Sequence, residues 1–223
     1  MRLALTLLIT LSMTLFAKSE DRPVKNFEKI EFEGFGNLII SQDGGATLRV
    51  TADDGVIGQL KTTVDGNSLK IETPRGIGSQ TPITYEVGVR RLKKISLEGA
   101  AMLSNTGTLT TEMLVLEIQG ASKADLTIEG TELKVEINGA GQVNMAGQVE
   151  HQEVEVNGAG RYLAFDLQTE STDIEINGTG KAEVSASERL NVEVNGAGSV
   201  SYRGNPKVSQ KIRGIGTVSH GAG

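Results

Sequence analysis

The feature that most constrains this 223-residue chain is a six-residue motif that returns at nearly even intervals. Glu-(Ile/Val)-Asn-Gly-(Ala/Thr)-Gly occurs four times, and degenerate copies extend the series in both directions. The first glycines of successive copies are separated by 21, 19, 19, 20, 18 and 18 residues: Gly99, Gly120, Gly139, Gly158, Gly178, Gly196 and Gly214. A period this short cannot contain a helix pair, and it fits one turn of a β-solenoid.

Apolar and polar side chains alternate on both sides of each glycine. Around Gly139, for example, the apolar positions are Leu133, Val135, Ile137, Val143 and Met145. A two-residue period is typical of strands with one buried face. The chain is also rich in glycine, with 28, and poor in proline, with four, which suits short strands joined by tight turns. The sequence therefore predicts an all-β fold, a right-handed β-helix of short coils of 18–21 residues.

The motif also predicts how each corner is built. Asn-Gly favours consecutive positive φ angles, because glycine lacks Cβ and asparagine tolerates the left-handed region. The second glycine of the motif is expected to let neighbouring coils approach closely or to form a bulge. The asparagines are expected to stack, with each side-chain amide bonding to the coils above and below: Asn138, Asn157, Asn177 and Asn195.

Residues 27–95 are less regular and are expected to form a β-meander cap over the coils of residues 96–220. Solenoid ends need such covering, and we expect residues 20–223 to form one domain. An outlying copy of the motif, Glu31–Gly36, lies inside this cap. The elements expected here are a strand at Ala46–Thr51, a short helical turn within Asp53–Leu60, a hairpin at Asp65-Gly66-Asn67, a loop at Arg75–Thr81 and a strand at Ile83–Val89.

The N-terminus has the pattern of a secretory signal peptide. Arg2 precedes an apolar run from Leu3 to Phe16, which is too short to cross a bilayer. Cleavage is expected after Ser19, with Ala17 as the rival site, and it would change the formal charge from −6 to −8. We therefore expect export to the periplasm or outer cell surface. An acidic chain does not suggest a nucleic-acid partner, and the lack of cysteine excludes a lipid anchor and disulfides.

The most distinctive polar feature is a column of glutamates at equivalent positions of five successive coils: Glu117, Glu136, Glu155, Glu175 and Glu193. Parity points them away from the core. A ladder of oxygen ligands could bind a divalent cation such as calcium, or a basic partner. The alternative is a solvated polar face that keeps the sheet from pairing with other chains.

Other residues offer weaker chemistry. The Gly-x-Gly elements lack the third glycine and the following helix of a dinucleotide site. His151 and His220 are expected in exposed loops, and without cysteine a structural zinc site is not expected. A carbohydrate-active β-helix enzyme, a polysaccharide lyase or glycosidase, would need acids and bases in a groove. The candidate acids and bases are Arg161, Lys181, Asp166, Asp173 and Glu183. A strip of aromatic rings for sugar stacking would use Tyr162, Tyr202 and Phe165, although the alternation of inward and outward positions points both tyrosines inward.

Several segments together resemble a known family. They are the opening Phe27-Glu28-Lys29-Ile30-Glu31, the hairpin segment Val64–Ile71, the strand Ile83–Val89 and the serial Gly-Ala-Gly coils. The chain is similar, over nearly all of its mature length, to the bacterial head GIN domain family of "putative auto-transporter adhesins", a domain of unknown function. The resemblance implies an extracytoplasmic β-helix with an adhesin-like role, and it supplies no catalytic residues.

These observations predict an exported, non-enzymatic cell-envelope protein with an adhesin-like or assembly role through its repetitive surface. The expected partner is an envelope protein or a glycan, and homo-oligomers could form through the last coil. No catalytic residue, cofactor or structural metal is expected apart from the calcium alternative. The carbohydrate-active enzyme is the competing hypothesis.

Overall fold

The computed structural model describes residues 17–74, 76–78 and 82–221. These residues form fifteen strands and one short helix: β1 (Ala17–Asp21), β2 (Lys29–Ser41), β3 (Thr47–Asp53), α1 (Asp54–Ile57), β4 (Lys61–Asp65), β5 (Ser68–Glu72), β6 (Thr84–Gly88), β7 (Lys94–Thr106), β8 (Leu109–Gly120), β9 (Lys123–Gly139), β10 (Gln142–Gly158), β11 (Arg161–Gly178), β12 (Lys181–Gly196), β13 (Ser199–Arg203), β14 (Lys207–Gly214) and β15 (Thr217–His220).

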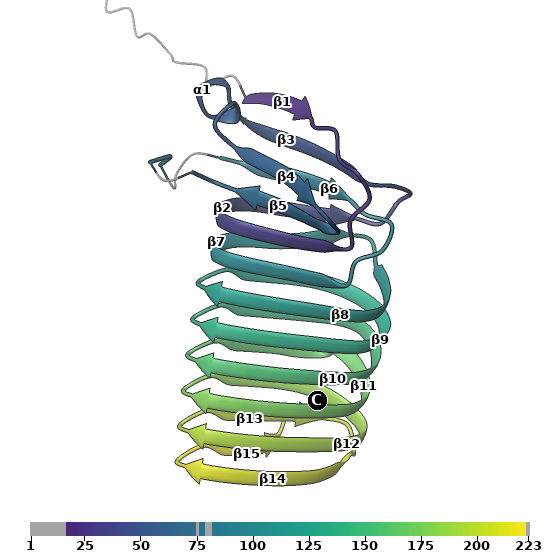
Figure 1. The fold of residues 1–223 in the computed structure, drawn as a ribbon. Helices are drawn as coiled ribbons and strands as arrows, with labels where there is room; N and C mark the ends of the chain where they lie inside the picture. The colour runs from purple at the N-terminus through teal and green to yellow at the C-terminus, as the bar shows by residue number, and fades with distance from the viewer. Residues whose placement is uncertain (1–16, 75, 79–81, 222–223) are drawn as a thin grey trace, which may run out of the picture.

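The long strands stack in parallel as the rungs of a β-solenoid (Figure 1). Each strand from β10 to β12 starts after one Gly-x-Gly corner, bends at the rounded side of the stack and ends at the next corner, and β9 follows the corresponding Gly120-Ala121-Ser122. We call the half that ends at a corner glycine the front face, and the half that follows the corner the back face. In Figure 1 the front halves run to the left and the back halves return to the right while the chain descends from the N-terminal to the C-terminal end, which makes the coil right-handed. The predicted all-β solenoid is confirmed.

The two corner glycines have different tasks. Gly158 has φ +123°, and a Cβ atom there would lie 2.7 Å from the carbonyl oxygen of Gly139 in the previous rung. A Cβ atom on Gly160 would instead lie 2.6 Å from Cγ2 of the buried Ile137. Among the described residues only glycines have positive φ, so the prediction that the asparagines adopt it is wrong. A β-region asparagine keeps its side chain on the outward row of the strand.

The core follows from register. Because successive rungs pair glycine with glycine, each inward position meets its equivalent in the next rung. One such column is fully buried from β8 to β12: Ile118, Ile137, Val156, Ile176 and Val194. The buried apolar side chains from Phe27 to Val200 form one continuous cluster. Each contributes on the order of 1.5–3 kcal/mol before chain entropy is subtracted.

The first rung precedes the cap. Strand β2 pairs with β7 over its whole length, and Gly34 lies opposite Gly99. The prediction of a cap over residues 27–95 is therefore wrong for β2, which is already a solenoid rung, and β3 to β6 are inserted after it. The insertion separates the two corner glycines by 65 residues, which hides the shared period.

The cap elements agree with the expected hairpin, helical turn and strands. Strands β4 and β5 form an antiparallel hairpin, and β3 pairs with β6 on one side and β1 on the other. Asp53 caps α1 by accepting a 2.9 Å hydrogen bond from the amide of Gly55. Of the expected loop at Arg75–Thr81, residues 75 and 79–81 lie outside the described residues, as does the predicted signal peptide up to residue 16. Residues 17–19 lie in β1, paired with Thr51, Ala52 and Asp53.

Candidate functional site

The glutamate column lies on the front face. Register pairs Glu117 with Glu136, Glu136 with Glu155, Glu155 with Glu175, and Glu175 with Glu193. All five side chains point outward between buried neighbours, as in the alternation Val154, Glu155, Val156. The column therefore exists as a geometric feature, at a spacing of roughly 4.8 Å between rungs. Its binding role stays a prediction.

An asparagine ladder runs beside the glutamates. Asn157 Nδ2 donates to Asn138 Oδ1 at 2.9 Å, Asn177 to Asn157 at 3.0 Å, and Asn195 to Asn177 at 2.9 Å. The expected stacking is confirmed. The same amides donate to the glutamates two residues earlier, at 2.6 Å from Asn138 to Glu136 and 2.8 Å from Asn157 to Glu155. Asn177 donates to Glu175 in the same way at 3.0 Å, so three of the ladder amides each hold one glutamate carboxylate in a defined orientation.

Basic side chains close both ends of the column. Lys94 Nζ lies 2.6 Å from Glu117 Oε1. At the other end Glu193 pairs with Lys211 at 3.3 Å and with Arg213. These two contacts, the lysine hydrogen bond foremost, hold the pKa of Glu193 below its ordinary value. For the three central glutamates, Glu136, Glu155 and Glu175, the described hydrogen-bond partners are asparagines rather than basic residues.

A shallow depression of about 490 Å³ follows the C-terminal half of the column. It is lined by side chains from β10, β11, β12 and β14. Its acidic members are Glu153, Glu155, Asp173, Glu175 and Glu193, and Lys211 lies at its end. Lysine or arginine side chains contact three of these five acids: Lys134 contacts Glu153 at 2.7 Å, Arg189 contacts Asp173 at 3.8 Å, and Glu193 has the two contacts given above. The depression is therefore an acidic strip along the stacking axis.

The described residues contain no group of three or more His, Cys, Asp or Glu side chains placed to hold a metal ion. Calcium takes six to eight oxygen ligands, whereas two neighbouring glutamates of one column supply only part of that number. Whether the column takes up calcium remains a prediction.

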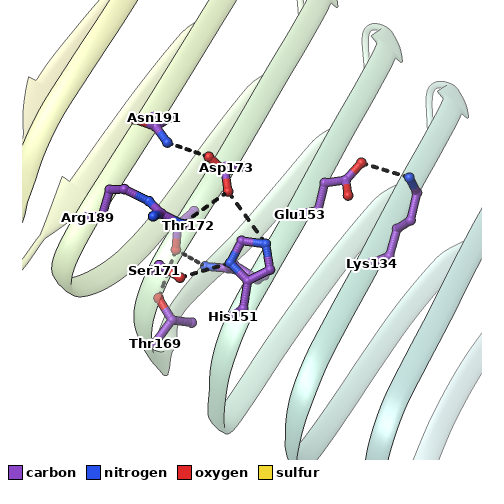
Figure 2. A network of polar contacts seen from close by, with 10 residues as sticks. Lys134, His151, Glu153, Thr169, Ser171, Thr172, Asp173, Arg189 and Asn191 are labelled. Carbon is purple, nitrogen blue, oxygen red and sulfur yellow. Dashed lines mark hydrogen bonds and ion pairs between the residues drawn. The ribbon is translucent and has the colours of Figure 1, made fainter.

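A second polar network crosses three rungs beside the strip (Figure 2). His151 Nδ1 lies 2.9 Å from Ser171 Oγ, and His151 Nε2 lies 3.5 Å from Asp173 Oδ2. Asn191 donates to the same carboxylate at 2.6 Å. The prediction that both histidines lie in exposed loops is wrong for His151, which lies half-buried in β10. His220 is exposed as expected, but it lies in strand β15.

Counting back from the corner glycines would have found this network. His151, Ser171 and Arg189 each lie seven residues before a corner glycine, and Asp173 and Asn191 lie five before one. The set contains a hydroxyl (Ser171), an imidazole (His151) and a carboxylate (Asp173) in contact, and these are the side-chain types that enzymes use for nucleophilic catalysis. Ser171, however, lies inside a parallel ladder, paired with His151 and Arg189, so its backbone amide belongs to the sheet rather than to an oxyanion site.

The residues of the carbohydrate-active hypothesis do not converge. Asp173 lines the front depression, whereas Asp166 and Glu183 line a groove on the back face. Lys181 is paired with Glu183 at 2.5 Å. Tyr162 is fully buried, as parity predicted, and the half-buried Phe165 lies under the guanidinium of Arg203 at 4.1 Å. These side chains form no shared stacking strip.

Tyr162 belongs to a buried polar cluster that the sequence analysis missed. Its hydroxyl donates to Gln152 Oε1 at 2.7 Å, and Gln152 Nε2 donates to Thr172 Oγ1 at 2.9 Å. Gln152 and Thr172 stand where the neighbouring rungs have Leu133 and Leu190. Burial raises the pKa of the Tyr162 hydroxyl, so it remains a donor. The cluster is enclosed in the core and offers no surface to a ligand.

No helix in the described part of the chain has the length and apolar character needed to cross a membrane.

Comparisons with known proteins give the same fold. A family model described as "Putative auto-transporter adhesin, head GIN domain" matches residues 26–206. A solved "putative adhesin" from Bacteroides fragilis is 22% identical, covers 93% of this chain and 98% of its own, and superposes with a TM-score of 0.85. A "putative lipid binding protein" and a "putative adhesin", both from Parabacteroides distasonis, are 20% and 22% identical, with 92% of this chain and 97% of theirs covered and TM-scores of 0.75 and 0.74. No curated protein matches.

Proposed function

The chain belongs to the head GIN domain family, and on that premise we propose that it is an exported, non-enzymatic protein of the cell envelope with an adhesin-like binding role. The observation that carries the proposal is the front face, where polar side chains recur on every rung in fixed register. The asparagine ladder holds Glu136, Glu155 and Glu175 in place before any partner arrives, so binding costs less side-chain entropy. A rigid, repetitive surface suits an extended partner that makes the same contact several times.

The chemistry of the face favours a cationic partner. The acidic strip of Glu153, Glu155, Asp173, Glu175 and Glu193 is only partly neutralised by Lys134, Arg189, Lys211 and Arg213. An envelope protein or glycan that presents amino or guanidinium groups along an extended chain would complement it. The adhesin descriptions of the family and of two solved neighbours support a binding role, and the lipid-binding description of a third is compatible with an envelope location.

A non-enzymatic role is supported by how the reactive groups are engaged. Asp173 already accepts from Asn191 and contacts both His151 and Arg189. A glycan array with product analysis tests this part directly. Binding without turnover is expected, and release of cleaved oligosaccharide would favour the carbohydrate-active enzyme.

The main test is capture of partners from the native envelope, with and without EDTA. The column variant Glu155→Gln with Glu175→Gln removes two charges from the strip and keeps the side-chain shape. Its matched control, Glu112→Gln with Glu188→Gln, removes two exposed charges outside the column. We expect the wild type and the control to retain a common partner that the column variant loses at moderate salt. Retention of that partner by all three proteins would refute the acidic face as the binding surface.

Calcium is tested separately by calorimetry and by melting in added calcium. If the column takes up the ion, heat and a melting shift will appear in the wild type and disappear in Glu136→Gln with Glu155→Gln. With only two carboxylates per pair of rungs we expect weak binding, with a Kd on the order of 10⁻³ M. Identical behaviour of wild type and variant would remove the calcium hypothesis while leaving the cationic partner intact.

A further inference from the structure

The last rung of the solenoid has unpaired edges on both faces. Strand β14 pairs with β12 on the front face, and β15 pairs with β13 on the back face. Within the part of the chain that the structure describes, no strand pairs with the other edge of either. The opposite end of the stack differs, because β1 and β3 to β6 cover it (Figure 1). Unpaired edges present a row of backbone donors and acceptors that can accept another strand.

Apolar exposure is concentrated at the same end. The described residues include five exposed large apolar side chains, and three of them lie in the last rung: Val208 at 36%, Ile212 at 39% and Ile215 at 83%. Val208 continues the core column below Leu190, and Ile212 continues it below Val194. Ile215 stands at the corner position that alanine or threonine occupies in the preceding rungs. The core is therefore open where the edges are open.

The outward side chains of β14 indicate the charge of the strand that would fit. Lys207, Lys211 and Arg213 are its charged residues, and it has no acid, although the chain as a whole carries −6. Elsewhere on this face a lysine meets an acid in the neighbouring rung, as Lys134 meets Glu153 at 2.7 Å and Lys211 meets Glu193 at 3.3 Å. A strand added below β14 would place its outward side chains beside Lys211 and Arg213, so acidic residues would complement it.

A second copy of the chain fits this edge less well. Antiparallel pairing of β14 with its own copy would set one basic row against another, and like charges directly opposite each other destabilise a strand pair. The last rung also begins at residue 207, immediately after the 26–206 segment that matches the family model. Its role therefore need not be the role that the family shares.

We propose that the last rung is a β-augmentation site for an extended, acidic segment of another protein. The segment would pair with the open edge of β14, cover Val208 and Ile212 with alternate apolar residues, and set its carboxylates beside Lys211 and Arg213. This surface lies at the end of the stack and adjoins the glutamate column at Glu193, which contacts Lys211 and Arg213. The partner test above changes Glu155 and Glu175, which lie outside it, so separate variants test the two proposals.

The probe is a synthetic peptide with the sequence of residues 170–180, Glu-Ser-Thr-Asp-Ile-Glu-Ile-Asn-Gly-Thr-Gly. Placed as the next parallel rung in the register of β11 and β12, its second glutamate would meet Lys211, the isoleucine after that glutamate would cover Ile212, and its threonine next to the aspartate would lie over Val208. The control peptide carries lysine at the aspartate and at that glutamate. Fluorescence anisotropy with the full chain should show saturable binding of the acidic peptide and about tenfold weaker binding of the control. No binding, or equal binding of the two peptides, would overturn the proposal.

Two variants locate the site. Ile212→Asp puts a charge at the open core and should weaken peptide binding by about tenfold or more. Met102→Asp makes the same kind of change at a residue that is 57% exposed in β7, and should leave binding unchanged. Circular dichroism of both variants checks the fold. If neither variant affects peptide binding, the site lies elsewhere. Light scattering gives the last outcome: a concentration-dependent dimer that Ile212→Asp abolishes, without peptide binding, would identify a second copy as the occupant and refute the acidic segment.

Discussion

At the residue scale, the corners depend on glycine for its backbone as well as for its small size. Gly158→Ala would place a methyl group against the carbonyl oxygen of Gly139 and force alanine to keep φ +123°. We expect the free energy of unfolding to fall by about 2 kcal/mol or more. Ala159→Ser, at the exposed residue between the two glycines, should change it by less than about 0.5 kcal/mol. Urea unfolding followed by circular dichroism measures both, and equal midpoints would contradict the strained corner.

The buried hydroxyl of Tyr162 gives a second residue-scale prediction. Tyr162→Phe would leave the enclosed Gln152 without its 2.7 Å donor. A buried polar atom deprived of its partner costs about 1–3 kcal/mol, so the variant should be less stable by that amount. Tyr202→Phe, at a half-buried tyrosine of the open end, is the control and should differ little from wild type. A neutral effect of Tyr162→Phe in chemical unfolding would show that Gln152 finds another donor.

Sequence reasoning succeeded for residues whose environment is dictated by two-residue alternation. It placed Tyr162 inside and stacked Asn157 on its neighbours, because parity and the corner glycine fix both positions. It failed for the φ of the asparagines, since glycine alone supplies the positive φ at each corner. It also separated His151 from Ser171 and Asp173. Those residues lie about 20 positions apart and meet only once the rungs are aligned.

At the scale of the element, the front edge of the stack depends on the ion pairs of Glu193. Lys211 and Arg213 lower the pKa of this carboxyl in the folded state, so the folded protein binds the proton less readily than the unfolded chain. The resulting stabilisation is present above the unfolded pKa and is lost as pH falls through the folded value. NMR titration of the Glu193 side chain should give a pKa below the ordinary 4.5.

Lys211→Met should raise that Glu193 pKa toward its ordinary value, because it removes the largest cause of the shift. Lys61→Met, in the cap hairpin, is the matched loss of one lysine charge and should leave the titration unchanged. If the pKa of Glu193 is the same in Lys211→Met as in the wild type, the ion pair with Arg213 alone lowers it.

Elements were predictable in proportion to their regularity. The rungs from β7 onward follow from the glycine spacing, and the cap hairpin follows from Asp65-Gly66-Asn67. The membership of β2 in the solenoid was missed, because β3 to β6 interrupt the period between Gly34 and Gly99. Of the candidate site, the glutamate column was predictable from the repeat. The acidic depression was not, because Glu153 and Asp173 occupy a column that holds Lys134 in one neighbouring rung and Asn191 in another.

At the scale of the whole molecule, each rung contacts its neighbours and stability accumulates along the stack. A chain that ends after residue 206 would lose β14 and β15 and keep all of the segment that matches the family model. We expect it to fold with the same circular dichroism shape and a lower melting temperature, since one layer of core contacts disappears. The peptide of residues 170–180 should also lose its docking edge. Global loss of structure in the truncated chain would show that the last rung is required for folding.

The side-chain dipoles of the asparagine ladder point in the same direction along the stack. Asn157, Asn177 and Asn195 all donate toward the N-terminal end. Glu155 and Glu175 prevent the first two amides from turning over, because a carbonyl would then face a carboxylate. The side-chain dipoles therefore add rather than cancel, with their negative pole at Asn195. Arg213 donates to that last oxygen at 3.1 Å. A row of neutral amides thus presents its negative end to a cationic side chain of the open end, and the two attract each other.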